Sequence, residues 1–206
     1  MANDNYPRGL FPLNFPNIPI RYYVVSTGQD IFLGMPVDFD STGFITPVID
    51  VTTAGIVQAV GVAVGFAGPL KRGLATDDPF LDASDLTTLA AGLPAGHRWV
   101  AVTDNPNQEF IVQGDTGGTL ATITAAGETI ALIYRATSGN TDSGWANLEF
   151  DASSNAASTG QLIRLLRLHD AVNVDGTENT VGANYQKWIC QIQTHRKTAS
   201  NLASAI

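Results

Sequence analysis

The sequence is dominated by short apolar runs, rich in β-branched and aromatic residues, which turn residues interrupt about every 8–12 residues. Runs of this length between Gly, Pro, Asn and Asp are typical of β-strands. A regular succession of them is typical of sandwiches and small barrels. We therefore predict an all-β protein with a small barrel or sandwich body. The expected strand regions are 20–27, 31–39, 44–50, 56–66, 97–104, 108–115, 119–125, 128–134, 161–170 and 185–195.

Glycines and prolines add detail to this prediction. The run IVQAVGVAVGF (56–66) contains glycines that indicate bulges or barrel corners. Pro36 and Pro47 mark sheet edges or strand ends, because proline cannot donate to a β-ladder. The periodicity of residues 161–170 fits a helix or a strand, and the flanking turn residues favour a strand. The polar residues 137–158 and 173–184 are predicted to lie outside the strands.

One region departs from the β pattern. Between Thr76 and Gly96, either Asp82 or Ser84 can cap a single short helix over Asp85–Ala91, and the glycine and proline that follow end it. We predict one short helical connector, or lid, at residues 76–96 within the β-rich body.

The N-terminal segment has prolines at positions 7, 12, 16 and 19. Proline fixes φ and removes a donor, so residues 1–19 are predicted to form an extended, polyproline-like arm. The arm is too apolar for an idle disordered tail. Two placements fit: the arm folds over its own domain, or it docks in a groove of a neighbouring subunit. The candidate partner-binding side chains are Leu10, Phe11, Leu13, Phe15 and Ile18.

The length of 206 residues suits one large domain or two small ones. We expect the arm at 1–19, a β-rich body at 20–195 that forms one unit or two subdomains, and a C-terminal tail at 196–206. The 11 basic and 19 acidic residues give a net charge of −8, which argues against a nucleic-acid groove or an anionic membrane surface as a partner. Charged residues make up only 15% of the chain, which suits a surface packed against copies or partners.

Cys190 is the only cysteine, so an intramolecular disulfide or a cysteine-based zinc cage is not expected. The N-terminus lacks the basic start and apolar run of a signal peptide. No stretch approaches the roughly 20 apolar residues of a membrane span. We expect a soluble protein made in a reducing compartment.

No residues are arranged as a catalytic centre. The G-x-S-x-G pattern of a serine nucleophile is absent from the sequence. The three histidines, His97, His169 and His195, lie in or beside predicted strands, where a histidine is usually a polar edge residue. Asp170 follows His169 directly, and adjacent strand residues point to opposite faces. Cys190 lies in an apolar run and is interpreted as a small buried hydrophobic residue.

No metal or cofactor site is predicted either. Asn173, Asp175 and Glu178 offer oxygen ligands, but without the spacing of a calcium-binding loop, so an ordinary Asp-Gly turn is favoured. The run GDTGG lacks the lysine and the following helix of a phosphate loop.

The stretch VTDNPNQEFIVQGD (102–115) is interpreted as a structural turn that leads into a strand. The short side chains of Asp104 and Asn105 are expected to bond to local backbone, and Pro106 sets the corner. Gln108 is placed to hydrogen-bond to backbone across the junction. Phe110 begins the strand that enters the core.

Four stretches in their order along the chain resemble one known family. They are RYYVVSTGQDIFLGMPVDFDSTGFITPV, AVGVAVGF, TDNPNQEFIVQGD and GQLIRLLRLHDAVNVDGTEN. This order resembles the structural cement, or head-decoration, proteins of tailed bacteriophages. Those proteins have a strand with GxPV, a DxPxQxF segment that runs into a strand, and a late leucine-rich strand before an Asn/Gly turn. Asp104, Pro106, Gln108 and Phe110 match the middle motif, and the resemblance covers residues 21–184.

The resemblance implies a virion structural protein on the outside of the capsid, made in the host bacterial cytoplasm. Such a protein clamps neighbouring subunits of the major capsid protein, stabilises the expanded head and has no catalytic site. We expect a homodimer or homotrimer that binds the major capsid protein, without nucleic acid, membrane or cofactor. The connector at 76–96 and the polar residues 139–158 depart from the family pattern.

An alternative function is a receptor- or carbohydrate-binding β module of a phage tail or fibre. Trp99, Trp145 and Trp188 are candidates for stacking on sugars. Trp145 is the one that lies in a predicted loop, and packing in the core or an interface also explains it. A small hydrolase on a β scaffold is a third, less favoured alternative, because no catalytic motif supports it.

Overall fold

In the part of the chain that the computed structural model describes, the regular secondary structure consists of β-strands alone. This confirms the predicted all-β class. The described residues are 7–15, 17–26, 28–49, 58–66, 80–82, 98–116, 126–152, 161–170, 178–180, 182 and 184–196. The strands are β1 (Phe11–Pro12), β2 (Arg21–Val25), β3 (Pro36–Phe39), β4 (Ile45–Pro47), β5 (Gly61–Gly65), β6 (Arg98–Thr103), β7 (Glu109–Gln113), β8 (Thr129–Ile130), β9 (Leu132–Gly139), β10 (Ala146–Phe150), β11 (Ile163–Leu168) and β12 (Lys187–Ile192). The helix predicted at Asp85–Ala91 lies outside the described residues. Within the described part, no helix has the length and apolarity needed to span a membrane.

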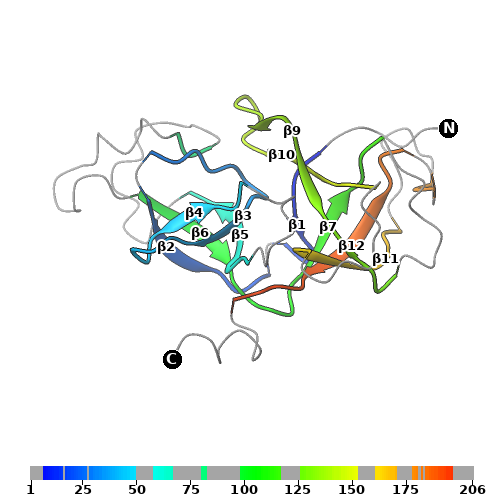
Figure 1. Ribbon diagram of the computed structural model, residues 1–206, viewed down its shortest axis with the longest axis horizontal. Coiled ribbons are helices and arrows are strands. Elements are labelled where there is room, and N and C mark those ends of the chain that lie inside the picture. Colours follow the sequence, from blue (N-terminus) through cyan, green and yellow to red (C-terminus); the bar gives the residue numbers. More distant parts are fainter. Residues whose placement is uncertain are drawn as a thin grey trace.

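Strands β2 to β6 close into a barrel in the order β2-β4-β3-β5-β6, which forms one end of the molecule in Figure 1. The β2–β4 pair is parallel and the other pairs are antiparallel. Alternate side chains of each strand point inward and are mostly β-branched, as a small barrel interior requires. Fully buried examples are Val25, Val37, Ile45, Val100 and Val102. The expected glycine bulge is present, since the β5–β6 register shifts between Ala63 and Gly65.

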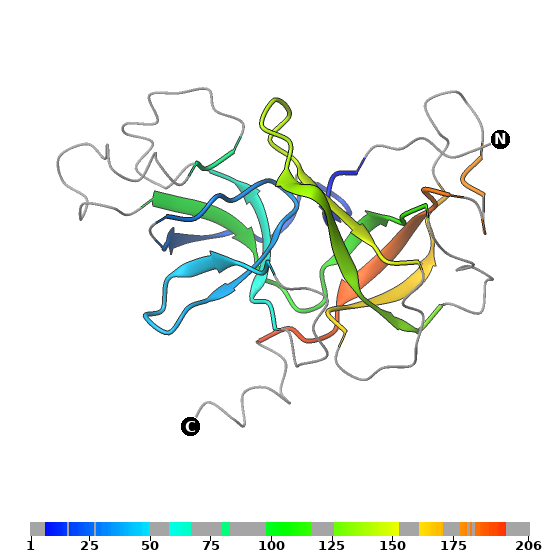
Figure 2. The same cartoon turned by 45° about the horizontal axis from the view of Figure 1, so that its top comes forward.

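The other end of the molecule is a five-stranded antiparallel sheet in the order β1-β7-β12-β11-β8. The two late regions predicted as strands, 161–170 and 185–195, form β11 and β12. The hairpin of β9 and β10 lies between the barrel and this sheet in both views (Figures 1 and 2). It packs closely on the sheet, because the ring of Phe150 occupies the space above Gly114 that a side chain would need.

The hairpin corrects one prediction. Residues 137–158 were expected to lie outside the strands, yet β9 runs to Gly139 and β10 covers Ala146–Phe150. The apolar side chains of β10 alternate toward the core, where Ala146, Leu148 and Phe150 are fully buried. The surrounding Ser, Thr, Asn and Asp residues conceal this alternation, and they form the hairpin turn rather than a long loop.

Barrel, hairpin and sheet meet at Leu33 and Gly34. The Leu33 N–H donates to Gly144 O (2.8 Å), and the Ala146 N–H donates back to Leu33 O (2.8 Å). The Gly34 N–H donates to Ala63 O of β5 (2.9 Å), and Gly34 O accepts from the Leu10 N–H (2.9 Å). The buried apolar residues of both ends accordingly form a single cluster.

The close approach at this junction requires glycine. Gly9 (φ 63°) and Gly34 (φ 81°) are both in the left-handed region that favours glycine. A Cβ at Gly34 would overlap the carbonyl oxygen of Arg8, and a Cβ at Gly9 would overlap that of Gly34.

Replacing Gly34 should therefore cost much more stability than replacing a glycine with the same conformation and free space. Gly43 (φ 85°) is the matched control, because a Cβ there meets no atom within 4 Å. We expect Gly43→Ala to lower the free energy of unfolding by about 1 kcal/mol through φ strain alone. Gly34→Ala should lose about 1–3 kcal/mol more through overpacking. Urea unfolding of both variants measures the difference, and equal losses would contradict the close contact.

Asp40 closes the turn between β3 and β4. Its Oδ1 accepts hydrogen bonds from the Thr42 hydroxyl (2.6 Å), the Thr42 N–H (2.8 Å) and the Phe44 N–H (3.0 Å). These bonds, led by the one from the Thr42 hydroxyl, lower the pKa of Asp40 from 3.8 to about 2. The turn therefore confirms the predicted break between these strands.

Because this pKa is lowered by folding, ionised Asp40 stabilises the fold above pH 4, and this contribution disappears as the pH falls from 4 to 2. Thr42→Val removes the hydroxyl that contributes most to the lowered pKa of Asp40. The pKa should therefore rise toward 3.8, and the pH range over which the stabilising contribution of Asp40 is lost should narrow. NMR titration of the carboxyl carbon measures both values. The same pKa in both proteins would show that the Thr42 hydroxyl has no such effect.

Candidate functional site

The N-terminal segment, residues 7–15, lies along the edge of the five-stranded sheet. Its strand β1 pairs with β7, with Phe11 opposite Ile111 and Pro12 opposite Phe110. A further backbone bond joins the Leu13 N–H to Glu109 O (2.9 Å). An edge position suits Pro12, since a proline there leaves no ladder bond unmade. This is the first of the two placements that the sequence left open, in which the segment rests on its own body.

Leu10 is the anchor of the segment. Its side chain is fully buried in the core cluster of its own chain, and its backbone bonds to Gly34. Burial of a leucine contributes about 1.5–3 kcal/mol. In this structure Leu10 is therefore a core residue, whereas Phe11 and Leu13 are half-buried at the sheet edge.

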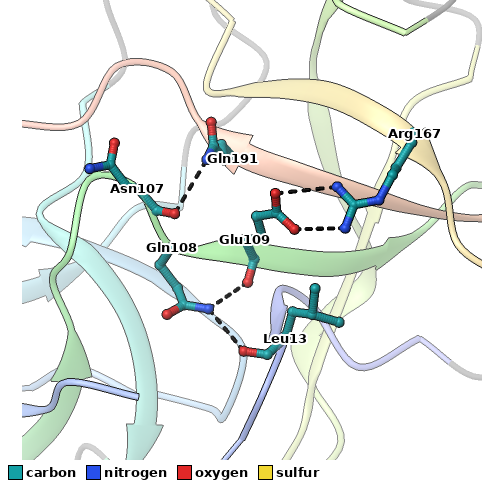
Figure 3. A network of polar contacts seen from close by, with 6 residues as sticks. All are labelled: Leu13, Asn107, Gln108, Glu109, Arg167 and Gln191. Carbon is teal, nitrogen blue, oxygen red and sulfur yellow. Dashed lines mark hydrogen bonds and ion pairs between the residues drawn. The ribbon is translucent and has the colours of Figure 1, made fainter. Parts of the chain in front are cut away.

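A polar network fixes the segment from the sheet side (Figure 3). The Gln108 Nε2 donates to Leu13 O (3.0 Å) and to Glu109 O (2.7 Å), which is the backbone bonding predicted for this glutamine. The Gln191 Nε2 donates to Asn107 O (3.3 Å). The Arg167 guanidinium reaches across β12 to both carboxylate oxygens of Glu109, at 3.2 and 2.9 Å. The network links three strands of the sheet to the N-terminal segment.

At Asn105 and Gln108 the turn before β7 makes the predicted backbone bonds. The Gln108 N–H donates to Asn105 O (3.0 Å) across Pro106, and the Asn107 N–H donates to the Asn105 side chain (3.0 Å). Phe110 is buried in β7. Asp104 connects the turn to the barrel, since its Oδ2 accepts a 2.5 Å hydrogen bond from the Tyr23 hydroxyl.

An aromatic cluster surrounds the start of the segment. The Phe11 ring centroid lies 5.6 Å from that of Trp145 and 6.2 Å from that of Phe15. The Arg8 guanidinium lies 5.9 Å from the centroid of the same Trp145 ring. Trp145 is thus half-buried between the hairpin and the N-terminal segment, with contacts that fit packing and cation–π attraction.

Exposed large apolar side chains concentrate immediately after this cluster. Phe15, Ile20 and Tyr22 are 50%, 39% and 43% exposed, and Ile18 is half-buried. Ile49, at 62%, is the other exposed large apolar residue in the described part of the chain. Tyr22 points outward because its strand neighbours Tyr23 and Val25 fill the barrel. We call the exposed side chains of Phe15, Ile20 and Tyr22, with their neighbours Ile18 and Arg21, the connection surface.

The connection surface lies in a stretch of this acidic chain that carries no acidic side chain. Arg8 and Arg21 are the only charged residues between Asp4 and Asp30, while the whole chain has a net charge of −8. Arg21 is 68% exposed, although its Nε lies 3.6 Å from Asp104. An exposed apolar surface beside arginines suits a protein partner that presents apolar and acidic groups.

The residues considered for catalysis lie apart. His195 and Cys190 are fully buried, and burial raises the pKa of the Cys190 thiol. Burial lowers the pKa of His169. His97, Asn173 and Asp175 lie outside the described residues. Among the residues that the structure describes, no three His, Cys, Asp or Glu side chains are grouped to hold a metal ion.

No protein-family model matches the sequence, and the search of curated proteins finds no match. The functional argument therefore rests on the residues of the chain itself.

Sequence reasoning did not single out Tyr22, Arg8 or Gly9. The run IRYYVV contains a signal for Tyr22, because a strand formed by this run has apolar residues on both of its faces. Antiparallel strands with one solvated face alternate instead. Apolar residues on both faces therefore indicate that the outer face is bound or covered.

The hairpin that carries Trp145 is fixed on the sheet by a buried carboxylate. Glu149 is fully buried, and it accepts hydrogen bonds from the Gln113 Nε2 (2.8 Å) and from the Arg135 Nε. The hydrogen bond to Glu149 is the main cause of the raised pKa of Arg135. Loss of Arg135 would leave a buried charge with one fewer partner.

We expect Arg135→Ala to lower the free energy of unfolding by about 2 kcal/mol, because it removes a charged hydrogen bond to a buried group. The control is Arg167→Ala, whose pair with Glu109 is solvent-exposed and should contribute less than about 1 kcal/mol. Urea unfolding near neutral pH measures both. Equal losses would contradict the special role of the buried carboxylate.

Proposed function

We propose that the chain is a virion structural protein, a cement or decoration protein that binds the outer surface of a bacteriophage capsid. The observation that carries the proposal is the connection surface, where Phe15, Ile20 and Tyr22 are exposed directly after a segment anchored by Leu10. Three exposed large apolar side chains within eight residues of sequence favour a docking surface over scattered solvent exposure. The resemblance to head-decoration proteins supports the same proposal.

In this role the barrel and sheet form a firm body, and the connection surface joins that body to the capsid lattice. Its contacts are neighbouring copies of the chain or subunits of the major capsid protein. Complete burial of one large apolar side chain contributes about 1.5–3 kcal/mol, less the cost of ordering it. Repetition over the shell adds avidity, so weak individual contacts suffice. The proposal needs no catalytic residue and no cofactor.

The alternative, a carbohydrate-binding module, depends on an accessible tryptophan. Trp145 already contacts Phe11 and Arg8 within its own chain, which supports a packing role. Glycan binding that is lost on Trp145→Ala, in a variant that unfolds like the unchanged protein, would favour the alternative.

The proposed function predicts that the protein co-sediments with expanded heads of the phage that encodes it, at a fixed ratio to the major capsid protein. A variant with Phe15→Ser, Ile20→Ser and Tyr22→Ser should bind about 100-fold more weakly, because each change loses about 1 kcal/mol of apolar burial. Ile49→Ser is the matched control, since Ile49 is exposed outside the connection surface. Failure of the unchanged protein to co-sediment would refute the function. Equal binding by the triple variant would refute the role of this surface.

A further inference from the structure

We infer that the N-terminal segment, residues 7–13, is exchanged between copies of the chain, so that each body receives this segment from a neighbouring copy. The inference rests on the proposed function in one respect, which is that a second copy of the chain is taken as the partner that covers the connection surface. It follows from how the segment is bound, how it is connected and what the connection exposes.

The binding site for the segment is contributed by residues distant in sequence. Gly34 O and Glu109 O accept the backbone bonds of Leu10 and Leu13, and the Gln108 Nε2 donates to Leu13 O. The body thus binds the segment as it would bind a short edge-strand ligand, with backbone bonds and one buried leucine. All these contacts form equally well with a segment from another copy, which is the condition for exchange.

The connection to the barrel, by contrast, is poorly held by its own chain. Asn14, Phe15, Asn17, Pro19 and Ile20 are exposed. Asn14 has a φ of 66°, in the left-handed region, and the Asn17 N–H donates back to Asn14 O (2.9 Å). Asparagine tolerates the left-handed region better than other non-glycine residues, which suits such a turn. An open connection would give up this local turn bond, whereas the backbone bonds of Leu10 and Leu13 to the body would remain.

The length and composition of the connection fit an open form. Fully extended, residues 14–20 would span up to about 25 Å. The prolines at positions 16 and 19 disfavour a compact return and favour an extended chain. In an exchanged pair two connections run between the same two bodies. Phe15, Ile20 and Tyr22 are then covered by the second copy instead of facing water.

The test uses the register of β1 and β7, in which Phe11 lies opposite Ile111. Two differently tagged chains, one with Phe11→Cys and one with Ile111→Cys, are co-expressed, purified together and oxidised. A disulfide-linked heterodimer on a non-reducing gel is expected, because only an exchanged segment brings these cysteines together. Phe11→Cys paired with Arg164→Cys is the control and should give no linked heterodimer, since β11 is separated from β1 by β7 and β12. The native Cys190 is buried and should stay unlinked in the unchanged protein.

A chain that carries both Phe11→Cys and Ile111→Cys completes the test. Linked dimers or larger species support exchange. An internally linked monomer, with no heterodimer from the mixed chains, overturns it. Light scattering measures the mass of the unchanged protein in solution, and this result does not depend on the folding of the cysteine variants. A monomeric mass also overturns the inference. Head binding is measured separately. A monomer that still co-sediments with heads refutes the exchange alone. An exchanged dimer that does not bind heads refutes the proposed function alone.

Discussion

The backbone junction at Leu33 and Gly34 is the constraint on which the rest of the structure depends. Through four hydrogen bonds it joins the N-terminal segment, the hairpin and the barrel strand β5. The contact is possible because Gly9 and Gly34 bring two backbones closer than a side chain would allow. The barrel and the sheet also share one buried apolar cluster. The junction also determines where Leu10 enters the core and therefore where the connection surface begins.

Longer-range polar contacts then fix the elements that this junction brings together. Glu149 holds the hairpin on β7, and Arg167 pairs with Glu109 across β12. At the C-terminal end of the described chain, Arg196 donates to Asp38 of β3 at 2.6 Å, which ties the segment after β12 back to the barrel. Each of these pairs joins residues far apart in sequence. They specify the relative placement of the elements that they join more than they add to stability, because most are partly exposed to solvent.

The all-β class was predictable because strand periodicity is a local property of the sequence. The strands around Val25, Phe110, Ile163 and Cys190 follow from short apolar runs bounded by turn residues, and the backbone bonds of Gln108 follow from its position after a proline turn. Strand β10 was missed because its buried Glu149 looks like a surface residue until Arg135 and Gln113 are placed beside it. The placement of Leu10 was left open for the same reason, since its partner Gly34 is a tertiary neighbour. Contacts between distant residues leave no periodic signal.

The charge distribution of the chain favours association through the connection surface. A chain with a net charge of −8 repels its copies, and at physiological salt this repulsion acts over a Debye length of about 8 Å. The residues between Asp4 and Asp30 carry no acidic side chain, and their only charges are Arg8 and Arg21. Association through this surface replaces repulsion by attraction to the acidic body of the neighbour, and it covers apolar side chains in the same step. An acid-free stretch with exposed apolar side chains is therefore a surface at which the proposed assembly avoids this repulsion.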